Sequence, residues 1–442
     1  MIAALSRFFT QVVHRFLPDP LIFSILLSLL VFVASLGMTP TTPVALITYW
    51  GEGFWKLLPF TMQMALVLVT GHALASSAAV GSAMRRVASL ARTPVQGVML
   101  VTFVAAVASV LNWGFGLVLG AMFAREVARR VPKSDYSLLI ACAYIGFLPW
   151  HGGLSGSIPL AAATEGNVME KVCGLIPMSR TLGTGYNLFI TLGLIVTLPF
   201  LTRMMLPRPE DIREVDPALL KEEPSTRRVL NADATFAERL EESSLLAWLV
   251  VLAIVVFLGL RIQERGLVKC IDINNVNMLF MALGLVLHGT PMAYARAITN
   301  SARGCASIML QYPFYAGIQA MMDLSGLGGV ITHAFIKVAT VQTFPFLVFF
   351  SSALVNFAIP SGGGHWVVQG PFVIPAAQAL GANLGKATMA IAYGEAWMNM
   401  AQPFWALPAL AIAGLGVRDI MGYCVTALLF SAVIFLLGLA LF

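Results

Sequence analysis

The sequence predicts an all-α polytopic membrane protein, built as two inverted repeats with paired re-entrant hairpins and broken helices. Hydrophobic residues make up 58% of the 442 residues and charged residues only 11%, whereas soluble globular chains carry about 25% charged residues. The mean hydropathy is +0.84. Several apolar runs reach the roughly 20 residues that a spanning helix needs. This composition excludes a soluble enzyme, a disordered protein and a nucleic-acid binder.

The charge distribution points to a lipid bilayer as the main partner. The net charge is +6, which is typical of a membrane protein whose cytoplasmic loops carry Lys and Arg. The five cysteines include no CxxC pair, and the six histidines show no His-x-x-x-His spacing. We therefore expect no disulfide framework, no metal site and no bound cofactor.

One charged segment divides the chain. Residues 206–242 hold one third of all Asp, Glu, Lys and Arg residues, together with four prolines, which break helices. The predicted organisation is therefore an N-terminal segment with the first transmembrane span over 1–42, membrane repeat 1 over 43–205, a charged cytoplasmic linker over 206–243 and membrane repeat 2 over 244–442.

The two predicted repeats share weak internal similarity. One apolar run ends in LNWG (111–114) and another in VNFA (355–358). Farther along, ACAY (141–144) matches AIAY (390–393). A second break follows each of these tetrapeptides, WHGGLSGSIP at 150–159 and MNMAQPFWALP at 398–408.

The positive charges favour opposite orientations for the two repeats. Arg85, Arg86 and Arg92 follow the apolar run at 57–79, so that span should run from outside to inside. The charged linker is also expected inside. Counting spans from the linker makes the run at 304–322 cross outward, which is the relationship expected of an inverted repeat.

Paired helix breaks inside apolar sequence indicate a transport site. A break in hydrocarbon is tolerated only where it is buried in protein or lines a cavity, and paired breaks mark the binding site of secondary transporters. The strongest candidate is PSGGGHW (360–366), just before an apolar helix at 366–380. A helix N-terminus there would attract an anion. The predicted cradle consists of Ser361, Gly362, Gly363 and Gly364, lined by His365 and Trp366.

The other breaks supply further candidates for substrate binding. Hydroxyl, amide and imidazole groups at these positions can donate hydrogen bonds to a carboxylate. An Asn at a break can instead cap the helix with its own side chain, and both roles stay open. The candidates are Asn112, Trp113, His151, Ser155, Ser157, Asn356, Asn399 and Gln402.

Glu395 is the candidate for ion coupling. It lies in the apolar stretch 387–397, where a carboxylate at the helix centre costs about 2.5–3.5 kcal/mol. Such a residue typically marks a proton or ion pathway. The alternative is a carboxylate that pairs with a neighbour for packing alone.

Five long stretches resemble the bacterial AtoE-type short-chain fatty acid transporter family, and the resemblance runs essentially from end to end. They are LPDPLIF (17–23), TPVQGVMLVTF (93–103), NWGFGLVLGAMFAREVARRVP (112–132), PSGGGHWVVQGPFVIPAAQALG (360–381) and IAYGEAWMNMAQPFWALPALAIAGLGVRDIMGY (391–423).

The resemblance implies a multi-pass carrier of the bacterial inner membrane, often dimeric and moving in an elevator fashion. The implied substrates are short monocarboxylates such as acetoacetate and butyrate. The Ser-Asn-Thr hairpin motif of dicarboxylate carriers in the same superfamily is absent here, which argues against a sodium site of that kind. The coupling ion, H⁺ or Na⁺, stays open.

Three other functions compete with this interpretation. A carrier of another small anion, such as a C4-dicarboxylate, would share the same breaks. A passive channel would conduct without accumulating its substrate. An intramembrane serine protease could use the GLSG sequence (153–156), with Ser155 as nucleophile and His365 as base, but it would leave the breaks of the second repeat unexplained.

Overall fold

A computed structural model describes most of the chain, namely residues 20–217, 234–267, 270–302, 305–356, 359–402 and 404–442. Parts of the predicted N-terminal segment (1–19) and of the predicted linker (218–233) lie outside the described residues, as do residues 357–358 of the VNFA sequence. The boundaries of the four predicted segments stay predictions.

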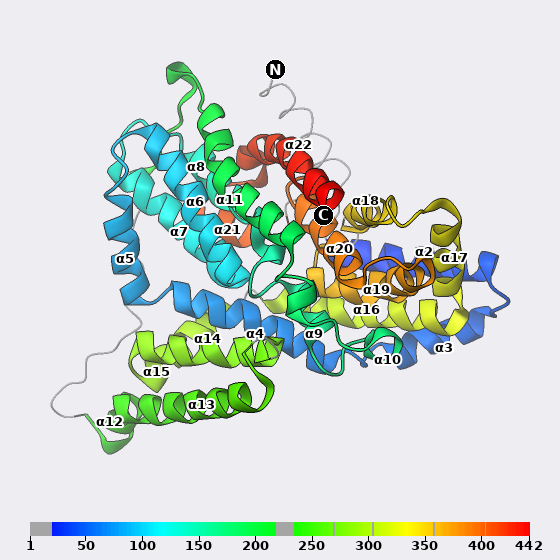
Figure 1. The fold of residues 1–442 in the computed structure, drawn as a ribbon. Helices are drawn as coiled ribbons and strands as arrows, with labels where there is room; N and C mark the ends of the chain where they lie inside the picture. Colours follow the sequence, from blue (N-terminus) through cyan, green and yellow to red (C-terminus); the bar gives the residue numbers. More distant parts are fainter. Residues whose placement is uncertain (1–19, 218–233, 268–269, 303–304, 357–358, 403) are drawn as a thin grey trace.

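The described residues form helices and contain no strand, which confirms the all-α class (Figure 1). The first half contains α2 (Pro20–Met38), α3 (Pro43–Gly53), α4 (Leu58–Ala75), α5 (Ala78–Ala88), α6 (Pro94–Leu111), α7 (Trp113–Arg130), α8 (Tyr136–Ile145), the 3-10 helix η1 (Leu148–Gly152), α9 (Ser157–Ala163), α10 (Glu170–Cys173), η2 (Met178–Arg180), α11 (Gly185–Met204) and η3 (Pro209–Asp211). The second half contains α12 (Phe236–Glu241), α13 (Ser244–Arg265), α14 (Ile273–His288), α15 (Pro291–Ala302), α16 (Ala306–Ser325), α17 (Leu327–Val338), α18 (Phe344–Asn356), α19 (Gly362–Leu380), α20 (Leu384–Met398), α21 (Ala406–Ala413) and α22 (Val417–Leu441).

Side-chain caps fix where the central helices begin. Asn112 accepts a hydrogen bond from Phe115 N at the start of α7, and Asp135 accepts one from Leu138 N at the start of α8. Asn383 does the same for Lys386 N at the start of α20. Because a bilayer offers no water to these backbone groups, each cap satisfies an N–H that would otherwise lack a partner.

Six helical segments in the described part of the chain are long and apolar enough to cross a membrane. α14 and α15 bend by 120° at a short break and make a possible seventh crossing if counted together. The span that contains α13 is only 17% buried, so most of its apolar surface is available to lipid. The chain is therefore a multi-pass membrane protein.

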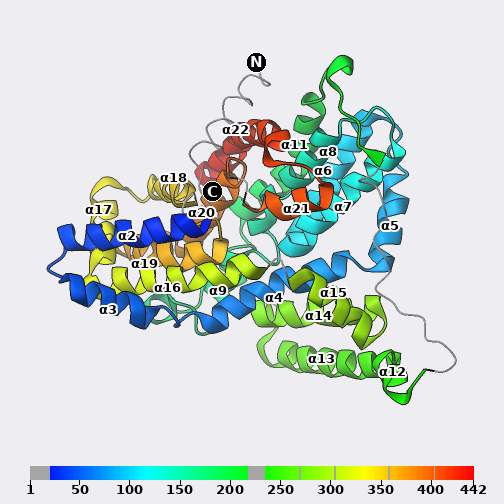
Figure 2. The same cartoon turned by 180° about the vertical axis from the view of Figure 1, so that it is seen from behind.

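The outer helices of the two halves are exchanged across the molecule. α4 of the first half packs against α14 and α15 of the second, and α16 of the second half packs against α2 and α3 of the first. Figures 1 and 2 show these two groups on opposite sides, with α13 outermost beside α14. This reciprocal packing is expected when two halves share one fold.

The inner helices show the same exchange at their breaks. α6, α7 and α8 pack on one another, as do α18, α19 and α20. The first-half break, η1 and α9, packs on α19 and α20, whereas α21 packs on α7 and α8. Each broken segment thus lies against the helices of the opposite half, and the buried core between them holds the predicted site residues.

Candidate functional site

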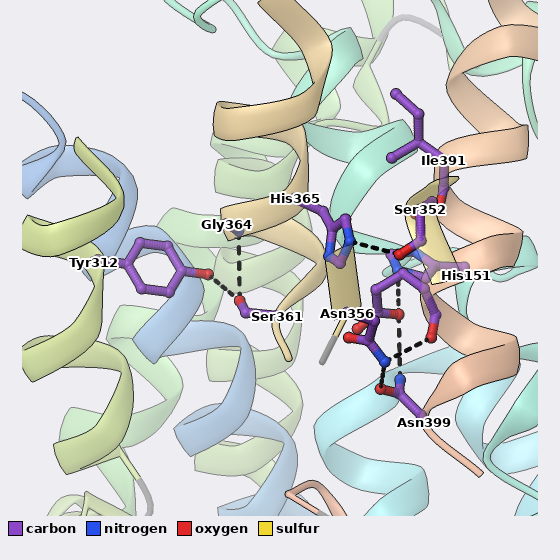
Figure 3. Close-up of polar contacts among 10 residues, drawn as sticks. His151, Tyr312, Ser352, Asn356, Ser361, Gly364, His365, Ile391 and Asn399 are labelled. Carbon is purple, nitrogen blue, oxygen red and sulfur yellow. Dashed lines mark hydrogen bonds and ion pairs between the residues drawn. The ribbon is translucent and has the colours of Figure 1, made fainter. Parts of the chain in front are cut away.

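The first turn of α19 is built from the three glycines of the predicted cradle. Ser361 has extended backbone angles, and its Oγ accepts a hydrogen bond from Gly364 N at 3.5 Å. This Oγ also lies 2.8 Å from Tyr312 Oη on α16 (Figure 3). The helix therefore begins at Gly362, four residues before the predicted start at 366, because Ser361 supplies the cap.

Glycine is required in this turn because other side chains approach the backbone closely. An added Cβ on Gly362 would lie 2.5 Å from His151 Cε1 and 2.6 Å from His151 Nε2. A Cβ on Gly363 would lie 2.6 Å from Tyr312 Oη. The absence of side chains brings the imidazole of His151 directly against the positive end of the α19 dipole.

Glu395 lies at the centre of a buried polar cluster. Its Oε2 is 3.1 Å from His151 Nε2, and both side chains are at most 1% exposed. Asn399 Nδ2 donates to the same Oε2 at 3.2 Å. Asn356 Nδ2 donates to Asn399 Oδ1 at 2.9 Å and to the Glu395 carbonyl at 3.2 Å. Figure 3 shows His151, Asn356 and Asn399 pointing toward one another.

His365 joins this cluster from α19. Its Nε2 lies 3.1 Å from the Ser352 carbonyl, and Ser352 Oγ donates to the Ile391 carbonyl at 2.7 Å (Figure 3). Because a carbonyl oxygen can only accept, His365 Nε2 must carry the hydrogen. The four helical elements η1, α18, α19 and α20 therefore meet through polar groups in an apolar core.

Several atoms of the cluster have no hydrogen-bond partner among the described residues. They are Glu395 Oε1, His151 Nδ1 and Nε2, His365 Nδ1 and Asn356 Oδ1, all buried. Buried polar atoms in proteins are almost always satisfied, and an unsatisfied one costs about 1–3 kcal/mol. So many in one place indicate a site that an ion, a proton, water or a substrate group completes.

Among the described residues, four first-half candidates (Asn112, Trp113, Ser155 and Ser157) form no hydrogen bond to Glu395. Ser155 Oγ accepts a hydrogen bond from Trp113 N at 2.8 Å, and the rings of Trp113 and Trp150 are 5.8 Å apart. Asn112 caps α7, and Ser157 is the first residue of α9. Ser155 thus joins the break at 150–159 to the start of α7, and Asn112 bonds to the first turn of the same helix.

Two further sequence candidates, Gln402 and Asn356, bond to groups of the second half. Gln402 Oε1 accepts a hydrogen bond from Phe404 N at 3.2 Å and stabilises the turn after α20. Asn356 and Asn112 both stand at the end of a helix, α18 and α6, but the Asn356 side chain bonds to α20 whereas that of Asn112 caps α7. The Ser155–His365 pair of the protease interpretation is also not formed, since each side chain bonds elsewhere.

Sequence reasoning missed several residues that hold the site together. Tyr312 bonds to Ser361, and Tyr144 Oη on α8 donates to the Asn399 carbonyl at 3.0 Å. Tyr393 Oη donates to Asn187 Oδ1 at 2.9 Å. The available signal was a tyrosine within an apolar run, because a buried phenol needs a hydrogen-bond partner.

A cavity of about 280 Å³ borders α19 at Trp366 and Val367, directly after His365, and sequence reasoning did not anticipate it. Phe60 and Trp366 are among its lining residues, and an added Cβ on Gly363 would lie 3.1 Å from Phe60 Cε1. The cavity therefore reaches the outer side of the first turn of α19. Its lining consists of Lys56, Leu57, Pro59, Phe60, Gln63, Ala161, Thr164, Glu165, Gly166, Asn167, Val168, Trp366 and Val367.

Comparisons with known proteins agree with this architecture. A solved structure of the Alcanivorax borkumensis YdaH transporter superposes with a TM-score of 0.59 at 16% identity, covering 95% of this chain and 98% of the other. At that identity the similarity concerns the fold.

Two proteins and one family model are similar to this chain in sequence. A protein of Escherichia coli (strain K12) is 65% identical over 442 residues, covering 100% of both chains, and one of Haemophilus influenzae (strain ATCC 51907 / DSM 11121 / KW20 / Rd) is 58% identical over 446 residues, covering 99% of each. Both carry the name "Putative short-chain fatty acid transporter". The family model described as "Short chain fatty acid transporter" matches residues 1–442. The chain belongs to the short-chain fatty acid transporter family.

Proposed function

We propose that this protein is a secondary active transporter that moves short-chain monocarboxylates, such as acetoacetate and butyrate, across the bacterial inner membrane together with a cation. The two relatives are named for this substrate class. In the same proposal, the paired breaks are re-entrant hairpins, and the protein works as a homodimer with an elevator motion, as the family resemblance implies.

The observation that carries this proposal is the buried start of α19 against His151. A carboxylate needs hydrogen-bond donors and positive potential, and the first turn of a helix supplies both. Ser361, Gly362, Gly363 and Gly364 form that turn, with His151 and His365 beside it. These residues are proposed to bind the carboxylate.

The cavity suits the rest of such a substrate. Phe60, Trp366 and Val367 present apolar surface for a short hydrocarbon tail, and Lys56 places a positive charge in the same lining. Ligand pockets for drug-sized molecules occupy about 300–1,000 Å³, so about 280 Å³ fits an acid of a few carbons. We assign this cavity as the approach to the α19 cradle.

Glu395 is proposed as the cation-coupling residue. It is 0% exposed, it lies on α20 of the second half, and its carboxylate faces His151 of the first half. A buried carboxylate in a membrane protein marks an ion or proton pathway more often than packing. A cation bound here would change the charge next to the carboxylate cradle.

The test is uptake of labelled butyrate and acetoacetate into liposomes that contain the purified protein. Separate proton and sodium gradients should be applied, with succinate as competitor and protein-free liposomes as the control for passive leak. Saturable accumulation under one gradient, insensitive to succinate, is expected. Inhibition by succinate would favour a C4-dicarboxylate carrier, and flux without accumulation would indicate a channel.

A further inference from the structure

We propose that His151 and Glu395 together hold one transported proton, and that this proton controls the affinity for a carboxylate at the first turn of α19. The inference deepens the proposed function and rests on it. It names the coupling ion as H⁺ and adds His151, from the other half of the chain, to the coupling machinery.

The charge inventory around Glu395 leads to this conclusion. Among the described residues, His151 is the only basic group within 4.0 Å of the Glu395 carboxylate. The other titratable groups that face the pair are His365 on α19, Tyr144 on α8 and Tyr312 on α16. No Lys or Arg within the described part forms an ion pair with Glu395, so no fixed positive charge neutralises this carboxylate and a bound proton would do so.

The pair has room for that proton without breaking a hydrogen bond. His151 Nε2 lies 3.1 Å from Glu395 Oε2 without forming a hydrogen bond, and both ring nitrogens of His151 and Glu395 Oε1 are without a partner in the described part of the chain. Either Glu395 Oε1 or the ring nitrogen of His151 that carries no hydrogen can accept the proton. The pair then carries no net charge, whereas without the proton it carries one negative charge.

This charge change acts on the substrate because His151 contacts the cradle. A Cβ on Gly362 would lie 2.6 Å from His151 Nε2, the atom that faces Glu395. A carboxylate bound at this turn would be repelled by an unprotonated pair with its one negative charge, and that repulsion would be absent from a protonated pair with no net charge. Proton and carboxylate therefore bind with positive coupling, which acts equally in both directions.

The charge of the His151–Glu395 pair also gives the ratio of protons to substrate molecules transported. One proton and one monocarboxylate anion enter the site on one side of the membrane and leave on the other, so no net charge crosses. Transport should respond to a pH gradient and not to the membrane potential. A hard cation such as Na⁺ prefers several oxygen ligands, whereas here an imidazole nitrogen occupies one side of the carboxylate.

The experiment measures counterflow exchange of labelled acetoacetate in proteoliposomes, with equal pH on both sides, across a series of pH values and at fixed Na⁺. Affinity should fall about tenfold per pH unit once the pair deprotonates, as expected for one linked proton. A pH gradient should drive accumulation, and a potassium diffusion potential should not. Protein-free liposomes again correct for permeation of the neutral acid.

Three variants separate coupling from structure. Glu395→Gln removes the negative charge, so exchange should persist with an affinity that no longer depends on pH, and accumulation should be lost. His151→Gln should abolish pH-driven accumulation and weaken exchange. His333→Gln alters an exposed histidine on α17 and should match the wild type in every measurement. Thermal unfolding and size-exclusion profiles check that each variant folds.

The outcomes distinguish the two proposals. If the wild-type protein exchanges neither acid at any pH, the proposed function itself is wrong. If it exchanges them with an affinity independent of pH, or only when Na⁺ is present, the assignment of a transported proton to His151 and Glu395 is overturned while the carrier function stands. Wild-type accumulation in folded Glu395→Gln or His151→Gln overturns it as well.

Discussion

The hydroxyl of Tyr393 donates a hydrogen bond to Asn187 Oδ1 across 2.9 Å, and this contact joins the two halves of the protein beside the buried cluster. Asn187 Nδ2 in turn donates to the Gly152 carbonyl at 3.1 Å. Tyr393 lies on α20 two residues before Glu395, and Gly152 directly follows His151. The chain of hydrogen bonds therefore sets the position of His151 relative to Glu395.

Replacing Tyr393 by Phe should allow His151 to move relative to Glu395. The lost hydrogen bond should lower the free energy of unfolding by about 1 kcal/mol, and pH-driven accumulation should fall more than equilibrium exchange. Proteoliposome transport compared with thermal unfolding checks this, with Tyr49→Phe on α3 as the matched control. An equal fall in accumulation and exchange would argue for a merely structural role.

Gly362→Ala should inactivate the carrier. The new Cβ would lie 2.5 Å from His151 Cε1, so the imidazole must move away from Glu395 and from the start of α19. We expect loss of both exchange and accumulation. The matched control is Gly329→Ala on α17, where an added Cβ meets nothing within 4 Å; that variant should transport normally. Normal transport by Gly362→Ala would show that the first turn of α19 is not the site that binds the carboxylate.

Lys56→Gln should weaken capture of the substrate. Lys56 is exposed and lines the cavity, so its charge should attract carboxylates more strongly at low ionic strength. KM should rise severalfold at low salt and converge with the wild type at high salt, with kcat unchanged. Lys337→Gln, at an exposed position on α17, is the control. If the variant and the wild type have the same KM at low and at high salt, Lys56 does not take part in substrate capture.

Substitutions of Asn112 separate capping from substrate binding. Asn112→Ala removes the acceptor for Phe115 N and should destabilise the protein by about 1 kcal/mol, whereas Asn112→Ser keeps a good cap. If capping is the role of Asn112, the Ser variant restores both stability and KM. A raised KM in a fully stable Ser variant would instead show that the amide contacts the substrate.

Local chemistry explains which features could be predicted from the sequence. The apolar runs, the breaks and the isolated carboxylate Glu395 are properties of short segments, so composition and spacing reveal them. The start of α19 was displaced by four residues, since the capping role of Ser361 depends on the backbone turn before it. Asn112 and Asn356 each stand at the end of a helix, but their side-chain partners could not be predicted, because Asn112 bonds to the helix that follows it and Asn356 bonds to α20.

The sequence by itself determined that this protein is a helical membrane protein with paired breaks and a carboxylate that needs a partner. The tertiary structure decided what that partner is. His151 reaches Glu395 only because the broken segment of one half packs on the helices of the other, whereas Asn356 and Asn399 belong to the same half as Glu395. The cavity beside Trp366 arises in the same way. Contacts between distant segments depend on how whole helices pack, and no short stretch of sequence encodes that packing.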